Sequence, residues 1–195
     1  MRRAFVSVVL LLSAFLVVPA SPAAAAPYCG LVWGSLDETA GDLWPSPIVN
    51  VRTGQHACYD RLVVDVAGDV GGYHVSYGRY LVNPGSGEAT ALRGGMVLQI
   101  TVNNPAHDES YNPTYTPADP RELTNVSGYR TFRQVVFAGT YEGYTTIGLG
   151  VRARLPSGSS CSTDRARGHA WWWTSRTAGD PASRSRTTAA VASAG

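Results

Sequence analysis

Residues 96–102 read MVLQITV, and this stretch decides the fold class. The apolar side chains of Met96, Leu98, Ile100 and Val102 occupy every second position. This is the period of a β-strand that buries one face and leaves the other to a different environment. We therefore expect an antiparallel strand here, with its apolar face turned toward a core.

Similar signals extend in both directions along the chain. Gly and Pro residues separate the segments, as in the turn predicted at residues 83–87 and the hairpin connection at residues 139–143. The 195 residues include 21 Gly, 12 Pro and 10 Tyr, which is typical of a strand-and-turn protein. An all-β domain is therefore predicted, either a small antiparallel β-sandwich or a partly open barrel. The expected strands are 48–52, 59–66, 72–82, 96–102, 130–137 and 145–153.

Residues 1–25 have the pattern of a secretory signal peptide. Arg2 and Arg3 precede the apolar run 4–18, and small residues follow up to Ala26. A transmembrane anchor is the alternative, but about 15 apolar residues fall short of the roughly 20 that span a bilayer. We expect cleavage after Ala25, no membrane span after signal removal, and a secreted, extracellular or wall-associated protein.

Export permits a disulfide among the three cysteines. We pair Cys29 with Cys58, which leaves Cys161 over. In the chain-entropy treatment a loop of this length stabilises the fold by roughly 3–4 kcal/mol. The bridge would tie an extended N-terminal arm, residues 26–47, to the β domain of residues 48–156. The sequence has no C-x-x-C pair and no set of metal ligands around His56, so no metal site is predicted.

The sequence holds no complete catalytic motif: H-E-x-x-H, G-x-S-x-G and the P-loop pattern are all missing. A non-enzyme without cofactor or metal is therefore predicted. The formal net charge of +2 makes nucleic acid an unexpected partner. We interpret Asp60 and Arg61 as a strand-edge ion pair and expect Asp65 to face water. The other polar candidates considered are His56, His74, His107 and Glu142.

The stretch 104–125 is long for a loop, and long ordered loops are often functional. Tyrosine rings stack on sugar faces and amides bind hydroxyl groups, so a polar ligand such as a glycan is one hypothesis. The alternative is a surface crossover whose tyrosines cover one end of the core. The candidate ligand-binding residues are Tyr111, Asn112 and Tyr115 in this loop, with Tyr141 and Glu142 at the predicted hairpin tip.

After Pro156 the composition changes to Ser, Thr, Ala, Arg and Gly without a β pattern. We expect residues 157–195 to be disordered; an aromatic sugar platform at 171–173 is an alternative. A third interpretation, an out-of-frame tail, explains more. Trp is encoded only by TGG and Thr codons begin with AC, so WWWT (171–174) read one base earlier encodes Val-Val-Asp. That frame can read RLVVD, as residues 61–65 do, and FRVFVL from 157–162. Two terminal strands would then be missing from the sheet.

Four strings carry a resemblance to a known family: residues 29–35, 51–56, 58–66 and 140–143. They resemble the AMIN-like domain of secreted actinobacterial proteins over roughly residues 29–156. The resemblance implies a small β-sandwich related to the amidase N-terminal domain, which is associated with targeting to the cell envelope through peptidoglycan or another wall polymer. The family pattern ends with strands like those of the shifted frame, and it brings no catalytic residues.

Two classes of function remain open from the sequence. The first is a non-catalytic module of the cell envelope that binds peptidoglycan, another wall glycan or an envelope protein. The second is a secreted hydrolase, or an inhibitor of one, acting at the cell wall; an acid pair in a cleft would favour it. We favour the first, because of the loop tyrosines and the family resemblance. The sequence predicts no oligomeric state.

Overall fold

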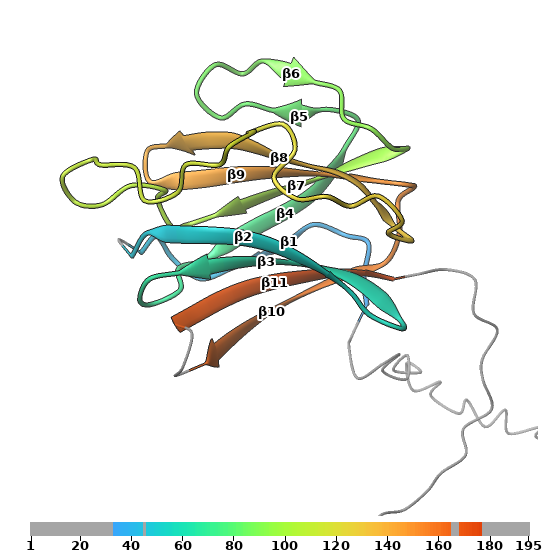
Figure 1. Ribbon diagram of the computed structural model, residues 1–195, viewed down its shortest axis with the longest axis horizontal. Helices are drawn as coiled ribbons and strands as arrows, with labels where there is room; N and C mark the ends of the chain where they lie inside the picture. Colours follow the sequence, from blue (N-terminus) through green and yellow to red (C-terminus); the bar gives the residue numbers. More distant parts are fainter. Residues whose placement is uncertain (1–32, 45, 165–167, 177–195) are drawn as a thin grey trace, which may run out of the picture.

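The computed structural model describes residues 33–44, 46–164 and 168–176, with only the backbone course from Ser160 onward. Two antiparallel sheets lie face to face, and a two-stranded ribbon covers the outer side of one of them (Figure 1). Every described regular element is a strand, so the predicted all-β sandwich is confirmed. The strands are β1 (Glu38–Ala40), β2 (Ile48–Gln55), β3 (Tyr59–Val66), β4 (Tyr73–Gly78), β5 (Leu81–Val82), β6 (Ala89–Thr90), β7 (Met96–Val102), β8 (Phe132–Tyr141), β9 (Tyr144–Val151), β10 (Ser157–Asp164) and β11 (Gly168–Arg176).

The larger sheet has the order β1-β4-β7-β9-β8, so β7 lies at its centre. The bounds of β7 are those that its alternating pattern predicts, and the bounds of β3 are those expected from its β-branched run. Leu98, Ile100 and Val102 of β7 are almost completely buried in the main core. They meet Leu62 and Val64 of β3, which belongs to the facing sheet of order β10-β11-β3-β2. The core therefore lies between the layers, as period-two burial requires.

The outer side of the larger sheet is also covered, by the β5–β6 ribbon and the segment after it. Val97 and Val136 point away from the main core and form a second cluster with Leu81. Gly150 makes the close approach possible, because a Cβ on it would lie 2.2 Å from the Arg93 carbonyl oxygen. Gly150 thus has a packing role inside β9 that the strand pattern does not indicate.

Strand β8 contains two β-bulges. Phe132 pairs with Val151 and Gln134 with Gly150, so Arg133 is an extra residue; a second irregularity lies between Phe137 and Gly139. A bulge changes the direction of side chains locally and is frequent beside functional sites. The first bulge also keeps Phe132 and Val135 in the same core although three positions separate them.

The structure corrects the expectation for the start of the tail. Residues 157–164 and 168–176 form β10 and β11, so these terminal strands are not missing and this part is not disordered. β11 pairs antiparallel with β3, with Trp171 opposite Val64. The backbone of β3 can pair with a neighbouring strand of many different sequences, and Trp and Thr favour β-structure. A strand therefore forms here although the composition of the segment shows no β pattern. Residues 177–195 lie outside the described residues.

Two polar residues of β3 are also placed differently from the expectation. Asp60 is completely buried and binds Thr131 across the sandwich; it is not a strand-edge partner of Arg61. Asp65 does not face open water, since its side chain is 14% exposed and receives two hydrogen bonds from Arg52 at 2.8 and 2.9 Å. Both carboxylates are structural because neighbouring donors hold them.

The predicted signal peptide, residues 1–25, and Cys29 lie outside the described residues, so the cleavage and the Cys29–Cys58 pairing remain predictions. Within the described part of the arm, residues 38–40 add β1 to the edge of the larger sheet through β4. In the part of the chain that the structure describes, no helix is long and apolar enough to cross a membrane.

Candidate functional site

The connection between β7 and β8, residues 103–131, is an ordered loop tied to both sheets. In Figure 1 it runs in yellow-green and yellow from the left end of the sandwich to the right. The Thr114 hydroxyl donates to the Ile48 carbonyl at 2.7 Å, which anchors the loop to β2. The Phe137 amide donates to the Pro120 carbonyl at 2.7 Å, which anchors it to β8. The loop therefore presents its side chains from fixed positions.

Asp108 organises the outer part of this loop. Its carboxylate accepts hydrogen bonds from the Ser110 amide at 2.9 Å, the Asn112 amide at 2.8 Å and the Asn112 side chain at 3.0 Å. These bonds, chiefly those from Asn112, lower the pKa of Asp108 because they favour the ionised carboxylate. Between them Tyr111 adopts φ of 62°, a left-handed conformation that is uncommon for a large residue. Asn112 thus supports the loop.

Tyr111 and Tyr115 lie along one hollow, which we call the aromatic groove. Its volume is about 460 Å³. The Tyr111 ring is 79% exposed and stacks on His107 with the ring centres 4.8 Å apart. Tyr115 meets Phe137 edge-on at 5.4 Å, and burial raises the pKa of its phenol. The groove is lined by Ala106, His107, Tyr111, Pro113, Tyr115, Thr116, Pro117, Pro120, Phe137 and Thr140.

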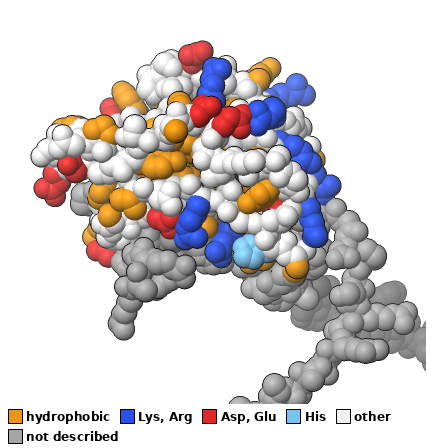
Figure 2. Space-filling model, viewed as in Figure 1, with side chains coloured by type: hydrophobic (Ala, Val, Ile, Leu, Met, Phe, Trp, Pro, Cys, Tyr) orange, Lys and Arg blue, Asp and Glu red, His pale blue; other side chains and the backbone are white. Residues whose placement is uncertain are grey.

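The aromatic groove has a mainly apolar and aromatic lining. Its lining contains aromatic rings, prolines and threonines but neither Asp nor Glu. Glycoside hydrolysis by the usual route needs two carboxyl groups that flank the scissile bond. Flat apolar surfaces with hydroxyl groups at their margins are what a sugar ring or an acetamido group requires. Figure 2 shows hydrophobic side chains gathered near the centre and left of this face.

The other two predicted site residues lie elsewhere. Tyr141 and Glu142 belong to the turn between β8 and β9, where Glu142 and Gly143 both have positive φ, 51° and 83°. Tyr141 packs beside the β5–β6 turn, since a Cβ on Gly85 would lie 3.4 Å from its ring. Neither residue lines the aromatic groove. Thr140 lines the groove but the two residues after it do not, so the five predicted residues do not form one site.

A second hollow was not predicted from the sequence. It measures about 330 Å³, and we call it the arginine pocket. Its members come from three separate segments, which the sequence alone does not bring together. It is lined by Arg93, Glu122, Asn125, Val126, Ser127, Gly128, Tyr129, Phe132 and Arg133.

The histidines and acids considered from the sequence are dispersed. His56 lies against Tyr59, and His74 shares a hydrogen bond of 2.8 Å with Thr39. Among the residues that the structure describes, no three His, Cys, Asp or Glu side chains gather closely enough to hold a metal ion.

Comparison with known protein families identifies the domain. The AMIN-like domain family matches residues 46–167. The matched region omits residues 29–45 of the resemblance described above and continues past Pro156 into β10 and beyond. No curated protein matches the chain significantly, and no solved structure does.

Proposed function

The chain belongs to the AMIN-like domain family, and from that membership we propose that it is an exported, non-catalytic module of the cell envelope that binds a wall glycan such as peptidoglycan. Domains of this family relate to cell-wall binding modules. In this proposal residues 1–25 direct export, a Cys29–Cys58 bridge fastens the arm outside the cytoplasm, and the protein remains at the wall or in the extracellular space.

The observation that carries the proposal is the exposed ring of Tyr111 above the aromatic groove. Tyr111 is 79% exposed, so its ring contributes little to the stability of the fold. The ring is nevertheless held in position, because Asp108 orders the loop around it and His107 stacks on it. An ordered, exposed ring beside an apolar groove is available for stacking on a sugar. The lack of a carboxylate in the groove lining favours retention of the polymer without cleavage.

The test is retention of the purified protein on insoluble peptidoglycan and on a second purified wall polysaccharide. Tyr111→Ala should weaken binding about tenfold, as expected for the loss of a central aromatic contact. Tyr80→Ala is the matched control: Tyr80 is 53% exposed but lies between β4 and β5, away from the groove. Its binding and the melting temperatures of both variants should equal those of the parent.

The same incubations distinguish binding from cleavage. Soluble reducing ends released in proportion to time would replace the proposal with the alternative, a wall hydrolase. Slower turnover of the polymer by an added hydrolase, without retention of the protein, would favour an inhibitor. Equal retention of Tyr111→Ala and the parent would show that the aromatic groove is not the binding surface.

A further inference from the structure

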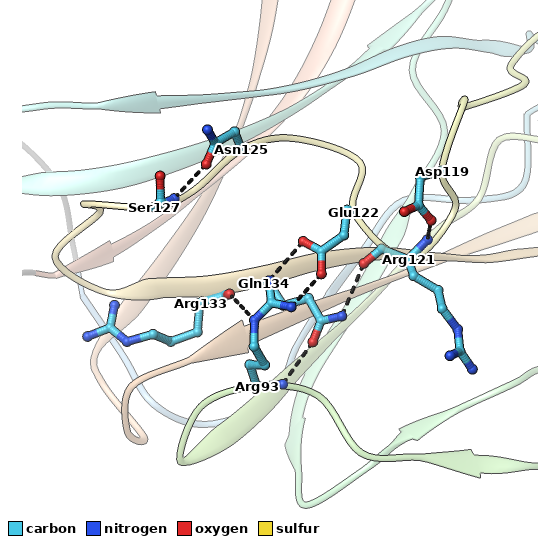
Figure 3. Close-up of polar contacts among 8 residues, drawn as sticks. All are labelled: Arg93, Asp119, Arg121, Glu122, Asn125, Ser127, Arg133 and Gln134. Atoms are coloured by element: carbon cyan, nitrogen blue, oxygen red, sulfur yellow. Dashed lines mark hydrogen bonds and ion pairs between the residues drawn. The ribbon is translucent and has the colours of Figure 1, made fainter.

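The arginine pocket lies farther along the same loop that forms the aromatic groove. Figure 3 shows Asn125 and Ser127 on one side and Arg93, Glu122 and Arg133 on the other. Arg93 and Glu122 form a double ion pair, with N–O distances of 2.5 and 2.8 Å. Arg93 also receives support from Gln134, whose Oε1 accepts its amide at 2.8 Å. This wall of the pocket is therefore built and electrically balanced.

Arg133 supplies a charge that the pocket does not balance. Its guanidinium donates to the carbonyl oxygens of Phe132 at 2.7 Å, Tyr129 at 3.0 Å and Arg130 at 3.4 Å. Those three bonds leave part of its five-donor fork available. Within the described part of the chain no carboxylate lies within ion-pair distance of Arg133. Of the three charged lining residues, Arg93 and Glu122 cancel, and Arg133 leaves one positive charge.

The backbone holds this charge in a fixed place at the border of the pocket. Arg133 is the extra residue of the first bulge in β8, and its three carbonyl partners fix the guanidinium before any ligand arrives. Such preorganisation lowers the entropic cost of binding. Tyr129 and Phe132 also line the pocket, and their rings stack at 5.8 Å and 11°, with Phe132 itself buried in the main core. A fixed guanidinium fork suits a planar anion such as a carboxylate.

We propose that the arginine pocket binds a carboxylate of the wall polymer, held by Arg133 while the neutral sugars occupy the aromatic groove. This proposal rests on the proposed function and assigns the acidic group of the wall polymer to the arginine pocket, a second site on the same loop. One unbalanced positive charge matches one carboxylate better than a doubly charged phosphate monoester. Along β8, Arg133 and Phe137 are four residues apart, on the order of 13 Å, which a short glycan with an acidic branch can span.

The experiment compares three soluble probes by calorimetry: a disaccharide-peptide fragment of peptidoglycan with free carboxylates, the same fragment with its carboxylates amidated, and a neutral chitin oligomer. The parent should prefer the free fragment about tenfold over the amidated one. Arg133→Gln should abolish that preference and leave the affinity for the chitin oligomer unchanged. Arg133→Lys, which retains the charge without the fork, should keep an intermediate preference.

Arg121→Gln is the matched control, because Arg121 is an exposed arginine of the same loop that does not line the pocket. It should bind all three probes as the parent does. Equal weakening of the free and amidated fragments by Arg133→Gln, or no preference in the parent, would overturn the assignment. Melting curves of the variants separate a lost contact from a lost fold.

A second measurement separates this inference from the proposed function. Free N-acetylmuramic acid should shift the NMR signal of the Arg133 Nε–H even if the protein fails to bind an insoluble wall. A stronger response to a glycerol phosphodiester than to N-acetylmuramic acid would overturn the choice of a carboxylate. Tyr111→Ala should bind all three calorimetric probes more weakly but keep the preference for free carboxylates. That result would support sugar binding in the aromatic groove and carboxylate binding in the arginine pocket.

Discussion

Thr131 donates two hydrogen bonds to the same oxygen of Asp60, from its amide at 2.5 Å and from its hydroxyl at 2.7 Å. Both residues are completely buried, and the pair joins β3 of one sheet to the residue that precedes β8 of the other. Two donors on one oxygen offset part of the cost of burying the carboxyl group, while its other oxygen, Oδ1, is buried without a hydrogen-bond partner among the described residues.

Thr131→Val should therefore destabilise the fold by about 2–3 kcal/mol, since it removes one of the two hydrogen bonds to a completely buried carboxyl group. Thr124→Val is the control; it removes a neutral, partly buried bond with Thr53 and should cost about 1 kcal/mol. Urea unfolding measures both. Equal free energies for the two variants would mean that the Asp60 contact is no more than an ordinary hydrogen bond.

Acid should loosen the outer loop before it unfolds the sandwich. The pKa of Asp108 is lowered in the folded protein, so its contribution is present above the ordinary value of 3.8 and is lost as the pH falls through the folded value. Protonation weakens the bonds from Asn112 and Ser110, and their amide protons should exchange faster in that range. In Asp108→Asn this step should vanish; its persistence would place the acid-sensitive group elsewhere.

The predicted bridge is tested by single cysteine variants made in an oxidising compartment. Cys29→Ser and Cys58→Ser should each lower the unfolding free energy by about 3–4 kcal/mol, and the double variant by no more than either alone. Cys161→Ser should have no effect. A loss with Cys161→Ser and none with Cys29→Ser would assign the bridge to a different pair.

The out-of-frame interpretation of the tail leads to a test at the level of DNA and of stability. The gene read one base earlier after Pro156 should encode two apolar strands, the second containing RLVVD where β11 now pairs with β3. The restored chain should melt several degrees higher, because each buried Val or Leu adds about 1.5–3 kcal/mol. Equal melting temperatures, or a gene without those strands in that frame, would refute the interpretation.

The fold was predictable where burial imposes a simple period. β7 has one face in the main core and its alternation gives its bounds, while the β-branched run at residues 62–66 indicates β3. β11 was not predictable in this way, because pairing with β3 and not an apolar period supports it. Asp60 shows the same limit: a carboxylate that is buried by a partner 71 positions away looks like a surface residue in the sequence.

From the sequence, the candidate site was predictable only where its residues lie close together along the chain. Tyr111 and Tyr115 share a groove because a single loop carries both. Tyr141 and Glu142 do not join them, since the tight turn carries these side chains to another part of the surface. The arginine pocket needs Arg93, Glu122 and Arg133 from three segments, and a bulge whose position no local pattern shows.

The loop that crosses β8 has a consequence for how the molecule behaves among its own copies. The Leu123 amide bonds to the Val135 carbonyl, and the Phe137 amide to the Pro120 carbonyl. Those two bonds occupy the outermost rim of the larger sheet, where a neighbouring molecule would otherwise add a strand. A shortened loop would remove the proposed binding surface and at the same time open that edge to self-association. In the proposed function, one segment therefore both recognises the ligand and protects the protein from aggregation, and both would be lost together.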